Sequence, residues 1–154
     1  MAIGIMEVFL IKAKGLKDAD FFGRMDPYVV IQYKGQVRKS SVARSEGKNP
    51  VWNEKFKLRA EYPGSGDDYN LILKIFDRDL LKADDYIGTA TIYVRDLLAL
   101  GVESGTAEMQ TNIHRVVLQD RSYRGEIHVD VTFTTWEEDK INEEVLGGWK
   151  SSHF

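Results

Sequence analysis

Short runs of alternating apolar and polar residues, separated by turn residues, dominate this chain. The alternation is clearest over residues 52–60, where Phe56 and Leu58 fall on one face and Lys55 and Lys57 on the other. A period of two residues is typical of a β-strand that buries one face and exposes the other. The pattern therefore predicts an all-β fold, an eight-stranded antiparallel β-sandwich. Its strands are expected at residues 5–12, 27–34, 37–42, 52–60, 69–76, 87–94, 113–118 and 125–133.

Two segments depart from the strand pattern. Residues 94–101, VRDLLALG, predict a short helix between the sixth and seventh strands, closed by Gly101. The last part of the chain turns acidic and begins with a capping box, which favours a short helix, but its thin apolar face is nearly as compatible with disorder. We therefore expect one domain over residues 1–135 and an acidic tail over residues 136–154.

Composition and charge narrow the function classes. The 154 residues are enough for one domain with a real core. A net charge of −3 argues against a protein that binds nucleic acid in bulk, and the lack of cysteine in the sequence excludes disulfides and thiolate metal sites. The apolar run at the N-terminus carries Glu7 and stops at Lys12, so it is too short and too polar for a signal peptide or a membrane span. We expect a cytoplasmic protein that meets membranes from the aqueous side.

Carboxylates gather where the predicted strands turn. If successive strands run antiparallel, the odd-numbered connections share one end of the sandwich, so residues 13–26 meet residues 77–86 there. At least five carboxylates then lie on one rim, and unit charges about 4 Å apart repel by roughly 4 kcal/mol at an effective dielectric of 20. A cation relieves this repulsion, and hard oxygen ligands on flexible loops favour Ca²⁺ over Mg²⁺ or Zn²⁺. The rim aspartates are Asp20, Asp26, Asp77, Asp79, Asp84 and Asp85.

The same aspartates have a simpler explanation when they are taken one at a time. Asp is common in turns and at helix caps, so ordinary turn chemistry accounts better for any single one of them. Only the spacing of the whole set favours a cation site. An EF-hand is excluded, because a loop starting at Asp77 would place Lys82 where that motif requires glycine and Gly88 where it requires glutamate.

Three motifs, DFFGRMDPYV, KNPVWNEKF and DRDLLKADDYIG, occur in an order and at a spacing that resemble the C2 domain family over about residues 3–133. The chain is also similar to the small plant proteins built from a single C2 domain, of the elicitor-responsive and phloem-protein type. The resemblance implies a Ca²⁺-dependent phospholipid-binding β-sandwich of type II topology. It also implies Ca²⁺ ligation by Asp20, Asp26, Asp77, Asp79 and Asp85, with added ligands from the carbonyls of Ala19 and Arg78.

Apolar residues occupy the tips of the two acidic loops. They are Phe21 and Phe22 in the first loop, and Leu80 and Leu81 in the third. Burying one such side chain is worth roughly 1.5–3 kcal/mol. We expect the aspartates to keep an anionic membrane away until Ca²⁺ neutralises them, after which these tips enter the headgroup region. The alternative for Phe21 is that it folds back onto the core.

Basic residues are concentrated in one part of the chain. Residues 34–59 carry a net charge of +6, while the remainder carries −9. An ordinary solvated face and a site for anionic lipid headgroups explain this segregation equally well. For the second, each cation adds about 1 kcal/mol near an acidic leaflet. The candidate headgroup residues are Arg38, Lys39, Lys55, Lys57 and Arg59.

Together these features predict a function and an alternative to it. We expect a monomer that Ca²⁺ recruits reversibly from the cytosol to the plasma membrane, where it binds phosphatidylserine and phosphoinositides in Ca²⁺ or defence signalling. The alternative is a Ca²⁺-independent adaptor or phloem trafficking protein that binds RNA or a protein cargo. An enzyme is not expected, because the sequence contains no nucleophile elbow and no grouping of Ser, His and acid.

Overall fold

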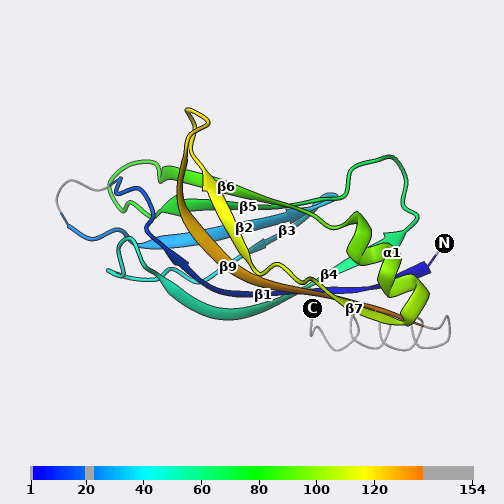
Figure 1. Cartoon of the computed structure of the whole chain (residues 1–154). Coiled ribbons are helices and arrows are strands. Elements are labelled where there is room, and N and C mark those ends of the chain that lie inside the picture. The colour runs from blue at the N-terminus through cyan, green and yellow to red at the C-terminus, as the bar shows by residue number, and fades with distance from the viewer. Residues whose placement is uncertain (1, 20–22, 137–154) are drawn as a thin grey trace.

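A computed structural model describes residues 2–19 and 23–136, which are drawn in colour in Figure 1. The described residues form nine β-strands and one helix, which lies between β6 and β7, so the predicted all-β class is confirmed. The elements are β1 (Ala2–Lys14), β2 (Pro27–Tyr33), β3 (Gln36–Lys39), β4 (Val51–Tyr62), β5 (Asn70–Asp77), β6 (Asp85–Tyr93), α1 (Arg95–Ser104), β7 (Thr106–Glu108), β8 (Ile113–Val117) and β9 (Tyr123–Thr135).

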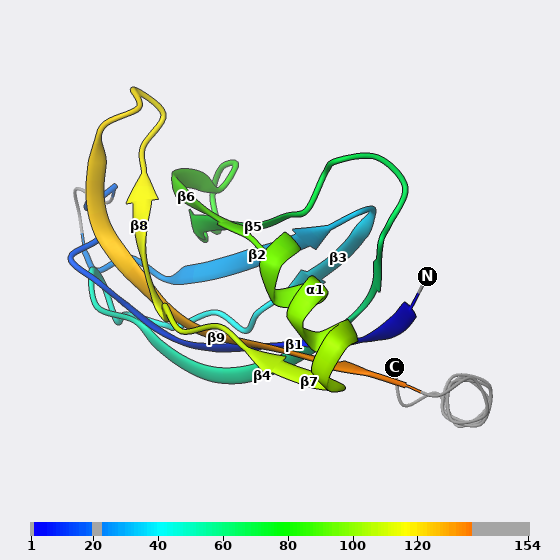
Figure 2. The same ribbon diagram turned by 45° about the vertical axis from the view of Figure 1, so that its right-hand side comes forward.

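The strands form an antiparallel sandwich that approaches a barrel. They pair in the order β3-β2-β5-β6-β8-β9-β1-β4, and only the pair of Thr89 and Val117 joins β6 to β8. The first four strands of this order form one layer and the last four the other, as Figure 2 shows. Fully buried apolar side chains fill the space between the layers. They include Met6, Val8 and Leu10 from β1, Leu71, Leu73 and Ile75 from β5, and Ile127, Val129 and Val131 from β9.

The predicted strands and their topology are confirmed. Each of the eight predicted runs overlaps a strand of the structure. β1 leads directly into the first acidic loop, and β9 lies beside it in the same layer, which is the strand order expected for type II topology. The structure adds the three-residue strand β7, which pairs with β9 through Thr106, Ala107 and Glu108. A strand this short has too few residues to show an alternating pattern.

The predicted end of the helix is wrong. Gly101 lies inside α1, and a Cβ atom added to it would be 2.5 Å from Cδ2 of Phe133 on β9. The glycine therefore permits close packing of the helix on the sheet. The helix ends at Ser104. The next residue, Gly105, caps it with a positive φ of 87° that suits glycine, and its N–H donates to the Gly101 carbonyl at 2.7 Å.

The two edge strands, β3 and β4, are joined by side chains in place of a β-ladder. Gln36 accepts the Arg59 N–H at 2.8 Å and donates to the Arg59 carbonyl at 2.7 Å, and Arg38 donates to the Lys57 carbonyl at 3.3 Å. These contacts satisfy backbone groups that an edge strand would otherwise present to solvent. The sandwich is therefore closed on the side opposite the Thr89–Val117 pair.

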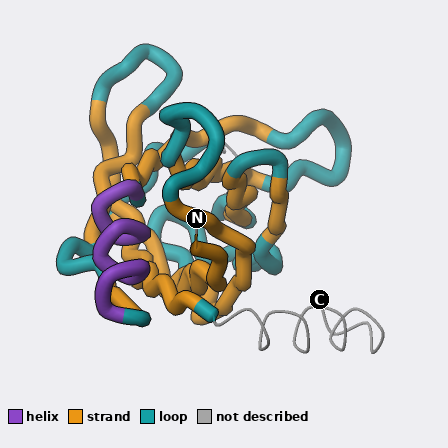
Figure 3. The backbone as a smooth tube through the Cα atoms, turned by 90° about the vertical axis from the view of Figure 1, so that its right-hand side faces the viewer, coloured by secondary structure: helices purple, strands orange, loops and turns teal. Residues whose placement is uncertain are grey.

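The odd-numbered connections meet at one end of the sandwich, as predicted. The Leu16 N–H donates to the Lys48 carbonyl at 3.1 Å, and the Gly47 N–H donates to the Met25 carbonyl at 3.0 Å. The tip of the β8–β9 hairpin shares a surface hollow with the first loop, lined by Lys17 and Asp120 among others. Figure 3 looks onto the opposite end, where α1 lies against the strands near the N-terminus.

The packing of Gly101 against Phe133 leads to a stability prediction. Helix propensity alone favours Gly101→Ala by about 1 kcal/mol, but the crowded Cβ position should instead destabilise the fold by about 1–3 kcal/mol. Urea unfolding followed by tryptophan fluorescence measures the difference. Leu100→Ala, on the exposed side of the same helix turn, serves as the control and should change stability by less than about 0.5 kcal/mol. A Gly101→Ala variant that is more stable than the parent would refute this account of the packing.

Candidate functional site

The acidic rim, the end of the sandwich that carries the predicted Ca²⁺ ligands, lies where β2 begins and β5 ends. Pro27 and Asp77 are paired residues of these strands, so the preceding Asp26 is held next to Asp77. The Asp26 N–H donates to Oδ1 of Asp77 at 2.8 Å, and the Arg78 N–H donates to the Asp26 carbonyl at 3.1 Å. The structure thus brings together two predicted ligands that lie far apart in sequence.

Both of these carboxylates are held in place by backbone donors. Asp77 is only 3% exposed, and a carboxylate so buried requires hydrogen bonds to offset its lost hydration. Oδ1 of Asp26 accepts the Ser45 N–H at 2.7 Å, which ties the second loop to the rim. These backbone hydrogen bonds therefore fix the orientation of the Asp26 and Asp77 carboxylates.

The other two described ligand candidates lie in the third loop. Oδ1 of Asp79 accepts the N–H groups of Leu81 at 2.8 Å and Lys82 at 3.2 Å, while Asp85 pairs with Asp77 at the start of β6. The Lys82 ammonium lies 3.4 Å from Oδ1 of Asp85 and 4.0 Å from Oδ2 of Asp79. One lysine thus places its positive charge between two predicted Ca²⁺ ligands.

Asp84 anchors the third loop to β2. Its Oδ1 accepts the Asp79 N–H at 2.9 Å, and its Oδ2 accepts a hydrogen bond from the Tyr28 hydroxyl. The Asp79 N–H and the Tyr28 hydroxyl lower the pKa of the Asp84 carboxyl below its ordinary value. Burial, followed by the bond to Asp84, raises the pKa of Tyr28 to about 12. From the sequence, Asp84 lies outside the ligand set and either supports the ligands or is merely solvated. Its bond to the Asp79 N–H favours the supporting role, and its partner Tyr28, distant in sequence, was not predicted.

The second motif, KNPVWNEKF, belongs to the framework of the site. Oδ1 of Asn49 accepts the Gly15 N–H at 3.0 Å, and Nε1 of Trp52 donates to the Pro27 carbonyl at 3.2 Å. These bonds hold the second loop and β4 against the first loop and β2. The motif therefore positions the rim and supplies no carboxylate to it.

The described rim aspartates offer the type of ligand that Ca²⁺ prefers, because they are hard carboxylate oxygens on adjacent loops. Within residues 2–19 and 23–136, however, no three Asp, Glu, His or Cys side chains converge on one point that could hold a metal ion. Asp20, Phe21 and Phe22 lie outside the described residues.

The leucine tip of the third loop faces solvent. Leu80 is 83% exposed and Leu81 is 97% exposed, more than any other large apolar side chain that the structure describes. The loop thus presents apolar side chains next to its carboxylates. Among the described residues, no helix is long and apolar enough to span a bilayer.

The structure divides the predicted basic residues. Lys39 stands over the Tyr28 ring at 4.5 Å on the outer face of the β2–β3 layer, whereas Arg38 turns toward β4. Lys55 stands 5.4 Å from the Phe9 ring and 3.9 Å from a carboxylate oxygen of Glu7. Lys57 and Arg59 are exposed and line a cavity that sequence analysis missed, since its walls come from separate elements.

Comparisons with known proteins agree with this geometry. The C2 domain family model matches residues 4–111. The chain is 52% identical to 16 kDa phloem protein 1 of Arabidopsis thaliana, covering 99% of this chain and 98% of that protein. It is 49% identical to elicitor-responsive protein 1 of Oryza sativa subsp. japonica, covering 97% of this chain and 96% of that protein.

Solved structures are similar to this one as well. A C2 domain-containing protein from a putative elicitor-responsive gene superposes with a TM-score of 0.68 at 36% identity, covering 89% of this chain and 93% of that one. The calcium-bound C2A and C2B domains of extended synaptotagmin 2 superpose with a TM-score of 0.63 at 25% identity, covering 88% of this chain and 47% of that one.

The lowered pKa of Asp84 leads to a prediction about pH. As the pH falls, the unfolded chain takes up this proton first, so the stabilisation by ionised Asp84 is present above about pH 4 and is lost as the pH falls through the lowered folded-state pKa. Asp84→Asn should therefore lower the Tm at pH 7 by a few degrees and converge with the parent in strong acid. Asp67→Asn, in the exposed loop at the opposite end, is the control. Equal Tm values for the Asp84 variant and the parent at pH 7 would contradict the anchoring role.

Proposed function

The chain belongs to the C2 domain family, and from this premise we propose that it is a Ca²⁺-dependent phospholipid-binding module. The observation that carries the proposal is the approach of Asp26 and Asp77 on a rim beside the exposed tip of the third loop. The existence of a calcium-bound relative with the same fold supports it. We further propose reversible recruitment from the cytosol to the plasma membrane, in Ca²⁺ or defence signalling.

The rim carboxylates would hold Ca²⁺ through oxygens of Asp26, Asp77, Asp79 and Asp85, with Asp20 completing the set. The bound ion would supply positive charge that neutralises the rim. Lys82 already supplies one positive charge between Asp79 and Asp85. This lysine would have to turn away for those two side chains to share an ion, so the loop is expected to rearrange on binding. Two bound ions would change the net charge of the chain from −3 to +1.

The exposed leucines would provide the apolar part of membrane binding. Moving Leu80 and Leu81 out of water is worth roughly 1.5–3 kcal/mol each, and Phe21 and Phe22 are proposed to add to it. Salt screens the charged part of the attraction over a Debye length of about 8 Å at physiological ionic strength. Salt does not screen the apolar part, so the two can be separated by experiment.

The basic strands would recognise anionic headgroups, phosphoinositides in particular. Lys57 and Arg59 project from the exposed face of β4. Lys39 and Arg38 contact an aromatic ring and a backbone carbonyl, which fixes their positions but leaves their charges in place. Lys55 also forms an ion pair with Glu7 at 3.9 Å. Each cation near an acidic leaflet contributes about 1 kcal/mol.

A second candidate function is favoured by two observations. The described carboxylates do not converge as a set of three, and the chain is 52% identical to a protein named for phloem. A Ca²⁺-independent adaptor or phloem trafficking protein, with RNA or a protein as its cargo, is therefore the alternative. Its basic surface would then bind another polyanion.

Calorimetry tests the ion site. The parent chain should bind Ca²⁺, and Asp77→Asn combined with Asp79→Asn should abolish the heat of binding, because two rim charges are removed. Since Asp77 is buried, Asp79→Asn alone is measured as well, and circular dichroism checks the fold of both variants. Asp67→Asn with Asp68→Asn, at the opposite end of the sandwich, is the matched control. Undiminished Ca²⁺ binding by the rim variants would sink the assignment.

Vesicle co-sedimentation tests the membrane switch. Phosphatidylserine vesicles should bind the chain with Ca²⁺ and release it in chelator. Raising salt should weaken binding but leave a residual part, and Leu80→Ala with Leu81→Ala should remove mostly that part. Leu100→Ala with Val102→Ala, exposed on α1, serves as the control.

The same assay separates the headgroup proposal and the alternative function. Lys55→Gln with Lys57→Gln should weaken binding to phosphoinositide vesicles more than to phosphatidylserine vesicles. Equal losses on both lipids would argue against a phosphoinositide site. If the parent binds vesicles equally with Ca²⁺ and with chelator, the switch is wrong and the adaptor takes its place.

A further inference from the structure

The β8–β9 hairpin projects from the sandwich, as both Figure 1 and Figure 2 show. The pairing of β9 with β1 stops at Glu126, opposite Lys14, so the hairpin tip extends beyond the paired part of β1. On one side the tip shares a surface hollow with the first loop, where Leu118 and Asp120 lie near Lys17. The hairpin therefore stands at the same end of the sandwich as the acidic rim.

Hydrogen bonds give the hairpin a fixed tip over residues 119–121. The Leu118 N–H donates to the Ser122 carbonyl at 2.8 Å, and the Arg121 N–H donates to the Leu118 carbonyl at 2.9 Å. The Asp120 carboxylate accepts the Ser122 N–H at 3.0 Å and the Ser122 hydroxyl at 2.6 Å. Arg121 has a positive φ of 71°, at the position where such turns favour glycine. The tip thus carries an arginine where backbone preference alone would select a residue without a side chain.

The hairpin is a basic exception in an acidic part of the chain. Residues 113–124 contain three arginines and one aspartate, although the chain outside residues 34–59 carries −9. A hollow at the base of the hairpin adds a lysine to this group and has Glu126 as its acidic member among the described residues. None of the four cations forms an ion pair with any residue that the structure describes. They are Lys14, Arg115, Arg121 and Arg124.

An exposed aromatic ring accompanies these cations. Tyr123 is 64% exposed, and among the large apolar side chains that the structure describes only Leu80 and Leu81 are more exposed. The Arg115 guanidinium lies 5.5 Å from the centre of the Tyr123 ring, a cation–π contact that holds the ring in place. Tyrosine has an apolar ring and a polar hydroxyl, which suits the interface between membrane and water.

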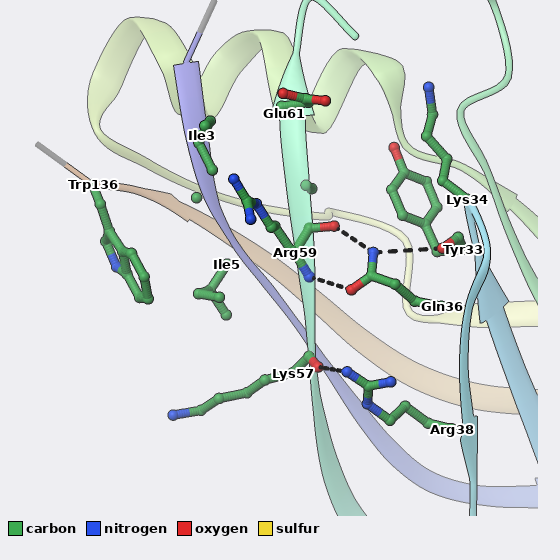
Figure 4. A pocket seen from close by; sticks show the side chains of 12 residues that line it. Ile3, Ile5, Tyr33, Lys34, Gln36, Arg38, Lys57, Arg59, Glu61 and Trp136 are labelled. Atoms are coloured by element: carbon green, nitrogen blue, oxygen red, sulfur yellow. Dashed lines mark hydrogen bonds between the residues drawn. The ribbon is translucent and has the colours of Figure 1, made fainter. Parts of the chain in front are cut away.

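The hairpin is separate from the basic face of β4. Strands β9 and β1 lie between β8 and β4, whose Lys57 and Arg59 are drawn in Figure 4. A projecting tip encloses no small molecule, because sites for small molecules are concave. An extended anionic surface can instead contact the tip and the cations around it. A membrane leaflet beside the rim is such a surface.

We propose that the β8–β9 hairpin is a further membrane contact, which binds an anionic leaflet beside the acidic rim. Arg121 and Arg124 meet the anionic headgroups, and Tyr123 lies in the headgroup layer. The proposal rests on the membrane function proposed above and adds to it a positive contact that is present without Ca²⁺. The third loop belongs to one layer of the sandwich and the hairpin to the other, so contact through both limits the tilt of the domain on the membrane.

Spin labels locate the hairpin relative to the membrane. The sequence contains no cysteine, so a single introduced cysteine accepts a nitroxide at one known position. Ser122→Cys reports from the tip, Leu80→Cys from the third loop, and Val102→Cys from α1 at the opposite end. With Ca²⁺ and phosphatidylserine vesicles, the labels at positions 122 and 80 should become less accessible to a water-soluble nickel chelate, and the label at 102 should not change. The label at 122 should lie shallower than that at 80, because arginine side chains keep their charged ends at headgroup level.

The two labels separate failure of this proposal from failure of the proposed function. Protection at position 80, with position 122 still in water, would overturn the hairpin contact and leave the membrane function intact. A lack of protection at both positions would contradict the membrane function and the hairpin contact together. Protection at position 122 alone would support the hairpin contact and argue against insertion of the third loop.

A charge variant measures what the hairpin contributes. Arg121→Gln with Arg124→Gln should weaken binding to phosphatidylserine vesicles roughly 10–30-fold, since each cation near an acidic leaflet adds about fivefold. Calorimetric Ca²⁺ binding should not change in this variant. Lys34→Gln with Arg95→Gln removes the same charge at the opposite end, beyond the Debye length from the leaflet, and should leave vesicle binding unchanged. Undiminished binding by the hairpin variant, or an equal loss in both double variants, would overturn the proposal.

Discussion

The hydrogen bond from the Asp26 N–H to the Asp77 carboxylate joins the start of β2 to the end of β5 and holds the acidic rim together. Antiparallel pairing returns the chain to the same end of the sandwich, so two residues 51 positions apart meet there. Asp77 is buried beneath this contact, and Asp26 also accepts a backbone donor from the second loop. A carboxylate in this position is costly to the fold unless donors surround it. The pairing of β2 with β5 therefore places negative charge at one end of the molecule.

Side-chain hydrogen bonds close the sandwich between its two edge strands, β3 and β4. Gln36 and Arg38 bind backbone groups of β4 and so replace a β-ladder between the two edge strands. A surface cavity lies beside these contacts. Closure also uses the Arg38 guanidinium, while Lys57 and Arg59 on β4 remain exposed. Fold closure and the distribution of charge are therefore linked.

The pattern of short β-rich runs predicted eight of the strands, most clearly where one face is buried in strict alternation, as in β5 and β9. The end of the helix was wrong, because glycine at position 101 serves packing against Phe133, a contact that no local pattern reveals. The grouping of the third loop with the first was predicted from strand count alone. The bond of Asp84 to Tyr28 and the ion pairs of Lys82 were not predicted, since they depend on how the third loop folds against β2 and on itself. The cavity was also missed, because Tyr33, Arg59 and Trp136 lie on three different strands or strand ends.

The central claim is that the acidic rim is a Ca²⁺ site that rearranges around Lys82. An NMR titration of the ¹⁵N-labelled chain with Ca²⁺ tests it most directly, because each backbone amide reports its own surroundings. The account predicts shifts at the amides of Asp26, Ser45, Leu81 and Lys82, whose hydrogen bonds involve the rim carboxylates. Amides of β7 and α1 at the opposite end should remain unchanged. Absence of any shift at the rim amides at millimolar Ca²⁺, or shifts confined to other regions, would contradict the account.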